Sequence, residues 1–273
     1  MASDRGIKVV QDGRLVWYRD TPDEDYWHGH WSDKVRSEYY EAARRQSLRT
    51  SELGRVIMDT FDVGDRVLEA GCGAGWYVAA LVAHGFDVDG IEFSKSLVGA
   101  VNTVAPDLPV RYGDACHLDE PDGSYGAYLS IGVVEHRLEG PELFLAEAFR
   151  LLKPGGRAVV TVPGFGPTRR SKAQFRRYGR RPPSDLPFYQ YGFRVEELAD
   201  LMTGAGFHVD NVGYQGVHRL LDEEAPSYRW AIRRRGGERV IRRALEKLLD
   251  TRDGHMALVV ATRPNEQSER TAR

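Results

Sequence analysis

The most constraining feature of this chain is a glycine-rich loop between an apolar run and a helical segment. The run Arg66–Glu69 has strand character, Gly71, Gly73 and Gly75 follow at two-residue spacing, and Trp76–Ala83 has the composition of a buried helix. Glycines let the backbone turn sharply and approach a ligand closely, and a helix N-terminus offers free N–H groups to a negative group. This order predicts a ligand site at the carboxyl edge of a parallel sheet.

The middle of the chain alternates between strand-like and helical segments. Further strands are predicted at Phe86–Ile91, Pro109–Tyr112, Ala127–Val134, Ala158–Val162, Phe207–Val212 and Met256–Ala261. Helices are predicted after an N-cap at Ser94, from Pro141 onward, and over Val195–Ala205. The alternation predicts an α/β fold with a seven-stranded, mainly parallel sheet and helices on both faces. A hairpin at Asp12-Gly13 lies outside this alternation.

Charge is concentrated in two segments of a chain whose formal net charge is only -2. Residues 164–194 contain eight basic residues and one acidic residue, and residues 229–247 contain eight basic and two acidic residues. The whole chain is therefore no polycation that binds nucleic acid by bulk charge. For residues 164–194 we favour a solvated loop, with an anionic small-molecule site and an RNA contact as the alternatives.

Cysteine content and hydropathy indicate the compartment. Cys72 and Cys116 are the two cysteines, too few for a disulfide framework. The sequence has no run of about 18 apolar residues, as a membrane-spanning helix needs, and Met1–Val10 has no apolar core of a secretory signal. We expect a cytoplasmic protein with no membrane segment.

The residues around the loop discriminate between nucleoside cofactors. A dinucleotide loop needs glycine at its sixth position, where Trp76 stands. Glu69, directly before the loop, favours a cationic amine over a pyrophosphate. Glu92 ends the second strand, where a carboxylate can take both ribose hydroxyls. S-adenosylmethionine carries an ammonium, a sulfonium, a ribose and an adenine, so the sequence favours it as the cofactor over NAD.

Five segments in order carry a resemblance to a known family: Glu69–Gly75, Glu92, Gly113–Ala115, Ser130–His136 and Leu151–Gly156. On them the chain resembles class I S-adenosylmethionine-dependent methyltransferases of the small-molecule and ubiquinone/menaquinone group, closely over about residues 62–162 and loosely over 188–207. The resemblance implies a Rossmann-like fold, with an N-terminal cap or lid at 1–61. The methyltransferase domain then spans 62–273, with acceptor-side insertions at about 164–194 and 214–253.

The resemblance also implies roles for single residues. Gly71, Gly73 and Gly75 approach the methionine part and the ribose, and Glu69 organises the amino end. Glu92 binds the ribose hydroxyls.

At the other end of the cofactor, Asp114 accepts a hydrogen bond from the adenine amino group and Ala115 offers its backbone. Phe93 stacks on adenine, with simple core packing as the alternative. Ser130, in the segment after the fourth strand, completes the expected cofactor-binding set.

His136 is our candidate catalytic residue. A general base contributes roughly 10²–10⁴-fold when the acceptor is a hydroxyl, and the alternative is that His136 caps or packs the next helix. Some quinone-pathway relatives hold a metal near Glu-x-x-Glu-His. Gly132 stands here in place of the first acid, so we predict no metal. In the aromatic cluster at residues 26–31 we favour packing, with Tyr26, Trp31 and Tyr39 as weaker site candidates.

We therefore expect an enzyme that transfers a methyl group from S-adenosylmethionine to a small-molecule acceptor, with oxygen favoured over nitrogen or carbon. The alternatives are an RNA or macromolecule methyltransferase that uses the basic segments, aminocarboxypropyl transfer or cyclisation of the same cofactor, and a non-catalytic binding module. An anionic acceptor is one option, and nucleic acid is disfavoured.

Overall fold

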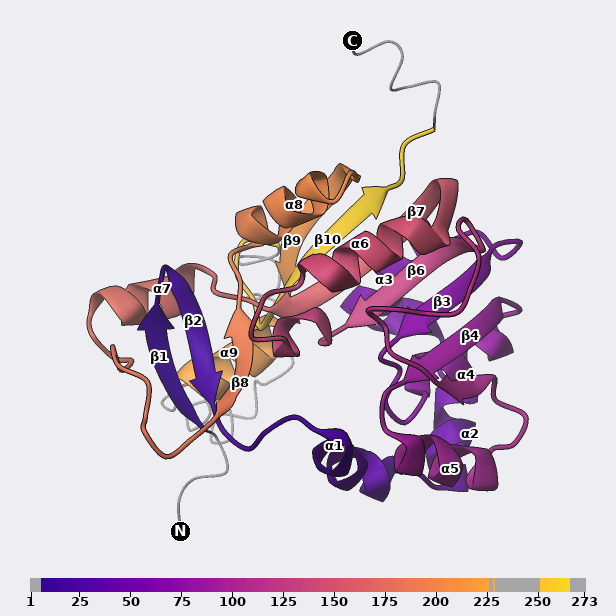
Figure 1. The fold of residues 1–273 in the computed structure, drawn as a ribbon, viewed down its shortest axis with the longest axis horizontal. Coiled ribbons are helices and arrows are strands. Elements are labelled where there is room, and N and C mark those ends of the chain that lie inside the picture. The colour runs from indigo at the N-terminus through magenta and orange to yellow at the C-terminus, as the bar shows by residue number, and fades with distance from the viewer. Residues whose placement is uncertain (1–5, 226–227, 229–250, 266–273) are drawn as a thin grey trace.

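A seven-stranded sheet forms the centre of the computed structural model, which describes residues 6–225, 228 and 251–265 (Figure 1). Its strand order is β5-β4-β3-β6-β7-β10-β9. The strands are β3 (Arg66–Ala70), β4 (Asp87–Glu92), β5 (Val110–Tyr112), β6 (Tyr125–Ile131), β7 (Leu152–Pro163), β9 (His208–Gln215) and β10 (Met256–Thr262). Strand β10 is antiparallel to both neighbours, and the remaining pairs are parallel. The predicted α/β class and mainly parallel sheet are confirmed.

Helices cover both faces of this sheet (Figure 1). One face packs against α2 (Ser37–Arg45), α3 (Glu52–Thr60), α4 (Trp76–Ala83) and α5 (Lys95–Val104). The other packs against α6 (Glu142–Leu151) and α8 (Val195–Gly204). Since the parallel strands end at one edge of the sheet, the loops that follow β3, β4, β5 and β6 lie close together there.

A second sheet of three strands lies beside the first (Figure 1). The hairpin of β1 (Ile7–Gln11) and β2 (Arg14–Tyr18) turns at Asp12-Gly13 as expected, and β2 then pairs with β8 (Phe188–Gly192). The favoured solvated loop at residues 164–194 is therefore wrong in part, because that segment contains β8 and the helix α7 (Pro167–Gln174). The division of the chain at residue 61 stays a prediction.

The remaining elements of the described residues lie near the N-terminus, after β6 and after β9. They are α1 (Glu24–Trp31), α9 (Val217–Glu224), and three short 3₁₀ turns at Ser32–Lys34, Leu48–Thr50 and Val134–His136. None of the helices within the described ranges combines the length and apolar character that crossing a bilayer requires.

Local sequence signals predicted the ends of several helices correctly. Other predicted ends differ from the observed ones by a few residues. Helix α4 has the predicted bounds, and the Ser94 hydroxyl accepts a hydrogen bond from the Leu97 N–H as the α5 cap. Pro141 is the N-cap of α6 rather than its first residue. Residues 153–156 are part of the long strand β7. The second basic segment, residues 229–247, lies outside the described residues.

A buried ionic cluster joins the hairpin, α7 and α9. Arg169 is fully buried, and its guanidinium pairs with Glu223 at 3.0 Å and Glu224 at 3.2 Å. Lys8 pairs with both glutamates, and Lys172 pairs with Glu224 at 2.6 Å. Part of the positive charge of residues 164–194 is thus neutralised inside the protein.

The same cluster makes stability sensitive to acid. Burial opposes ionisation of Glu224, but hydrogen bonds from Lys172 and Lys8 outweigh it and lower its pKa to about 2. Burial likewise opposes ionisation of Glu223, and its contacts with His255 and Arg169 hold its pKa well below the usual range. A carboxylate with a lowered pKa stabilises the fold above its unfolded pKa, near 4.3. That contribution disappears as the pH falls towards 2.

Replacing Arg169 with methionine should lower the free energy of unfolding by about 3–5 kcal/mol, because removing one partner leaves buried charges uncompensated. Urea unfolding at neutral pH measures this loss. Arg170→Met is the matched control, since Arg170 is exposed on the same helix. Equal effects of the two substitutions would contradict a stabilising role for the cluster.

Candidate active site

The glycine loop after β3 holds three residues in left-handed backbone conformation. Gly71, Gly73 and Gly75 have φ of 78°, 54° and 77°. The N–H groups of Gly71 and Cys72 both donate to the Ile91 carbonyl, at 2.8 and 2.9 Å. These bonds tie the loop to the end of β4, so that the start of α4 and the end of β4 face one space.

The Glu92 side chain, at the end of β4, also binds the glycine loop. Its Oε2 accepts from the Gly73 N–H and its Oε1 from the Ser94 N–H, both at 2.9 Å. The side chain is buried, and burial raises its pKa in spite of these hydrogen bonds. The Gly73 N–H that a phosphate would use is already bound to a carboxylate.

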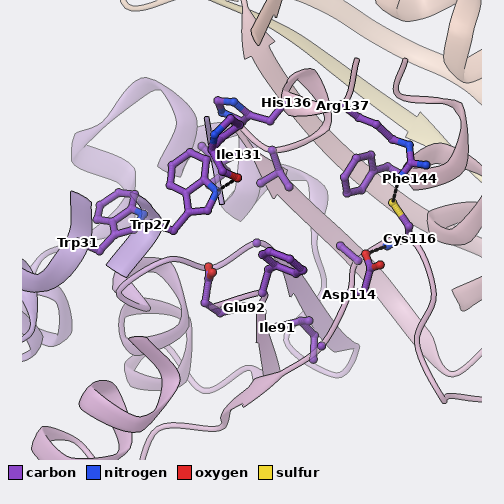
Figure 2. Close-up of a pocket in the computed structure, with 17 residues that line it drawn as sticks. Trp27, Trp31, Ile91, Glu92, Asp114, Cys116, Ile131, His136, Arg137 and Phe144 are labelled. Atoms are coloured by element: carbon purple, nitrogen blue, oxygen red, sulfur yellow. Dashed lines mark hydrogen bonds between the residues drawn. The ribbon is translucent and has the colours of Figure 1, made fainter. Parts of the chain in front are cut away.

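A pocket of about 260 Å³ opens at this edge of the sheet (Figure 2). Six of the predicted site residues line it: Gly71, Glu92, Phe93, Asp114, Ala115 and His136. Glu69, Gly73, Gly75 and Ser130 do not line it. Ser130 is fully buried on β6, where strand alternation directs it to the face opposite Ile131, which does line the pocket.

The far end of the pocket is formed by the segment after β5. Asp114 Oδ1 accepts from the Cys116 N–H at 2.9 Å, which shapes a tight turn. The Arg137 guanidinium lies 3.9 Å from the Cys116 Sγ (Figure 2). Phe93 also lines the pocket and is 44% exposed. Asp114 lines the pocket, so its carboxylate can accept a hydrogen bond from a ligand.

Buried carboxyl groups concentrate around the pocket. Glu69 lies at the end of β3 and Glu135 just after β6, both almost fully buried, and each has one oxygen with no hydrogen-bond partner in the described part of the chain. Burial raises the pKa of each to about 8. No lysine or arginine within the described ranges pairs with Glu69, Glu92 or Glu135. A cationic ligand would relieve the desolvation of these acids.

Helix α1 lies across the mouth of the pocket and contributes two indoles, Trp27 and Trp31 (Figure 2). The helix is anchored at its start, because Ser94 Oγ donates to the Glu24 carbonyl at 3.0 Å. Trp31 lies directly on the glycine loop: a Cβ at Gly73 would come within 2.8 Å of its ring. Of the three aromatic candidates, Trp31 lines the pocket, whereas Tyr26 and Tyr39 do not.

Gly73→Ala should therefore lower stability in a way that depends on Trp31. The left-handed φ alone costs about 1–2 kcal/mol for a residue with a Cβ, and the clash with the indole adds to it. In a Trp31→Ala background the clash is gone, so the penalty should fall. Urea unfolding of the four proteins of this double-mutant cycle measures the coupling. Additive effects would mean that Trp31 does not contact the loop.

His136 lies where the pocket meets a wider cleft. Its Nδ1 is 2.9 Å from the Tyr189 carbonyl oxygen, so Nδ1 carries the proton and Nε2 is left as a base. Trp27 and Tyr189 pack edge-on against the imidazole, each at 4.9 Å between ring centroids. Burial lowers the pKa of His136 to about 4, which keeps the ring neutral at physiological pH.

The wider cleft continues from Pro22, Phe93 and His136, which it shares with the pocket. Apolar side chains form much of its wall: Pro22, Phe93, Leu138, Pro187 and Phe188. Asp23, Glu24 and Asp25 stand at its edge. None of the eight basic residues of 164–194 lines either space.

Several pocket residues were not anticipated from sequence, above all Trp27, Arg137 and Phe144. The spacing of Trp27 and Trp31, four residues apart on one helix, was the available signal for the first. The described residues bring together no group of three or more His, Cys, Asp or Glu side chains suited to a metal ion.

Comparisons with known proteins agree with this geometry. Residues 68–160 match the methyltransferase domain family. A probable S-adenosylmethionine-dependent methyltransferase of Mycolicibacterium smegmatis is 31% identical over 151 residues, which are 54% of each chain. A demethylmenaquinone methyltransferase of Beutenbergia cavernae is 38% identical over 149 residues, 49% of this chain and 60% of the relative.

The fold also matches a solved structure, an S-adenosylmethionine-dependent methyltransferase from Methanosarcina mazei. Its TM-score is 0.55 at 19% identity, over 77% of this chain and 98% of that one. This chain spans about half the length of the curated relatives it matches. Residues 68–160 are thus similar to the methyltransferase domain family, and the fold is that of solved S-adenosylmethionine-dependent methyltransferases.

Proposed function

We propose that this protein binds S-adenosylmethionine in the pocket beside the glycine loop and methylates a small molecule held in the adjoining cleft. The observation that carries the proposal is a set of three buried acids, Glu69, Glu92 and Glu135, none of which pairs with a lysine or arginine among the described residues. Glu92 lines the pocket itself. A pyrophosphate would meet the carboxylate of Glu92 at the Gly73 N–H. An ammonium and a sulfonium would be attracted there.

The residues present fit the parts of this cofactor. Glu69 lies outside the pocket lining and attracts the amino end through its charge. Glu92 holds the ribose hydroxyls, and Asp114 and Phe93 bind the adenine. Trp27 and Trp31 close the pocket from above and exclude water. When bound, the cofactor supplies a methyl group activated by the positive sulfur.

His136 acts as the base for a hydroxyl acceptor. Its unprotonated Nε2 takes the hydroxyl proton while the Tyr189 carbonyl keeps Nδ1 protonated. Glu135 Oε1 lies 3.8 Å from Nε2. In its ionised form, Glu135 stabilises the imidazolium that forms when His136 takes the hydroxyl proton. A base at this position supports our preference for oxygen as the methylated atom.

The cleft favours an acceptor with an apolar body over an anionic one. Its wall is mainly apolar and its edge is acidic, with no lysine or arginine among the residues that line it. The relative from Beutenbergia cavernae, named for a demethylmenaquinone acceptor, supports the same class. We therefore propose a phenolic or quinol-type acceptor rather than a phosphorylated one.

Methyl-labelled S-adenosylmethionine and matched acceptors test this proposal. We expect label transfer to uncharged phenols and quinols, with release of S-adenosylhomocysteine, and weak transfer to their carboxylated or phosphorylated counterparts. Methylthioadenosine as the product, in place of S-adenosylhomocysteine, would contradict methyl transfer.

A further inference from the structure

The helix α7 is held in one orientation by its inner face. Arg169 and Lys172 pair with Glu224 from α9, and the Tyr178 hydroxyl donates to the same carboxylate at 2.8 Å. Arg170 lies on the outer side of the helix and is exposed. Figure 1 places the C-terminal end of α7 at the edge of the molecule, beyond the three-stranded sheet.

The turn that follows α7 presents charge and one aromatic ring to solvent. Phe175 is 73% exposed. Five arginines close to it in the sequence are also exposed, and none of them makes an ion pair with a described residue: Arg170, Arg176, Arg177, Arg180 and Arg181. Asp185 is the single acid between residues 164 and 194. This surface is therefore strongly positive.

Arg176 occupies a backbone position that normally takes glycine. Its φ is +55°, and the Arg177 N–H donates back to the Lys172 carbonyl at 2.9 Å, which closes the helix. Glycine is preferred at this left-handed position because it has no Cβ. An arginine at this position, against the preference of the backbone, points to a role for its side chain.

We propose that Phe175 and the five arginines around it form a docking surface for an anionic lipid bilayer. The phenyl ring inserts at the level of the headgroups, and the arginines contact lipid phosphates. Aromatic and basic side chains together are typical of interfacial binding. The ion pairs with Glu224 hold α7 against α9, so the segment that presents the ring and the charges starts from a fixed helix.

The other aromatic side chains of this segment argue against nucleic acid as the partner. Binding of single-stranded RNA uses several rings that stack on successive bases. Here Tyr178 bonds to Glu224, Tyr189 to the Tyr26 hydroxyl, and Tyr191 to the Leu138 carbonyl. These three tyrosines are half-buried and held by these hydrogen bonds, whereas Phe175 is 73% exposed.

Sedimentation of the full chain with vesicles tests the proposal. We expect binding to vesicles of phosphatidylcholine mixed with phosphatidylglycerol, and little binding to phosphatidylcholine alone. Phe175→Ala should lower the partition coefficient about tenfold. Arg176→Gly should lower it about fivefold, while the melting temperature stays the same or rises because glycine relieves the strained backbone.

Arg45→Ala is the matched control for charge, since Arg45 is exposed on α2 at the other end of the molecule (Figure 1). It should leave vesicle binding unchanged. An equal loss with Arg45→Ala would show an effect of net charge only and overturn the docking surface. Binding to single-stranded RNA without binding to anionic vesicles would assign the surface to nucleic acid. The assay uses no cofactor, so its outcome is independent of the methyltransferase reaction.

Discussion

Replacing Glu92 with alanine is expected to weaken the binding of S-adenosylhomocysteine by about 100-fold or more. Hydrogen bonds to charged groups contribute about 1.5–3 kcal/mol each, and Glu92 is proposed to make two to the ribose. The substitution also removes the acceptor for the Gly73 and Ser94 N–H groups, so the loop loses its fastening to β4. Calorimetric titration measures the dissociation constant.

Two further variants make this result specific. Glu92→Gln keeps one oxygen acceptor and the side-chain volume, so its loss of affinity should be smaller. Glu38→Ala removes an exposed carboxylate on α2, outside the pocket, and should leave binding unchanged. Melting curves separate loss of binding from loss of the fold. Affinity retained in folded Glu92→Ala would remove Glu92 from the cofactor site.

Replacing His136 with asparagine is expected to lower kcat by roughly 10²–10⁴-fold and to leave cofactor affinity nearly unchanged, because a general base acts mainly in the transition state. The pH profile gives an independent readout. Burial lowers the pKa of His136 to about 4. Nε2 therefore stays unprotonated above that pH, and kcat/KM should show no acid limb near pH 6.5.

His84 provides the control for this substitution. Its Nδ1 lies 2.8 Å from the Ala80 carbonyl oxygen at the end of α4, and it lines neither the pocket nor the cleft. His84→Asn should change stability slightly and kcat not at all. Unchanged turnover in His136→Asn would mean that the histidine only packs between Trp27 and Tyr189.

Much of the fold followed from local signals in the sequence. The glycine loop, the Ser94 cap and the alternation of strands and helices each depend on residues near one another in the chain, and each is present. The three-stranded sheet could not be predicted in this way. It pairs residues 14–18 with residues 188–192, and no local pattern identifies partners that far apart.

The sequence also predicted part of the site correctly. Glu92, Asp114 and His136 follow strand ends, and strand ends of a parallel sheet meet at one edge. The burial of Glu69 and Glu135 required the packed structure, since a sequence does not tell how much water a carboxyl retains. Ser130 was predicted wrongly as a lining residue, because its neighbours in the sequence do line the pocket. Its side chain lies on the face of β6 opposite that of Ile131.

The most direct test of this account is calorimetric titration of S-adenosylmethionine near pH 7, in two buffers that differ in ionisation enthalpy, with NAD as the control. Glu69 and Glu135 have pKa values of about 8, so a cationic ligand should lower both and release protons as it binds. The account predicts micromolar binding of S-adenosylmethionine with proton release, and no heat from NAD. Binding of NAD, or no binding of S-adenosylmethionine, would contradict it.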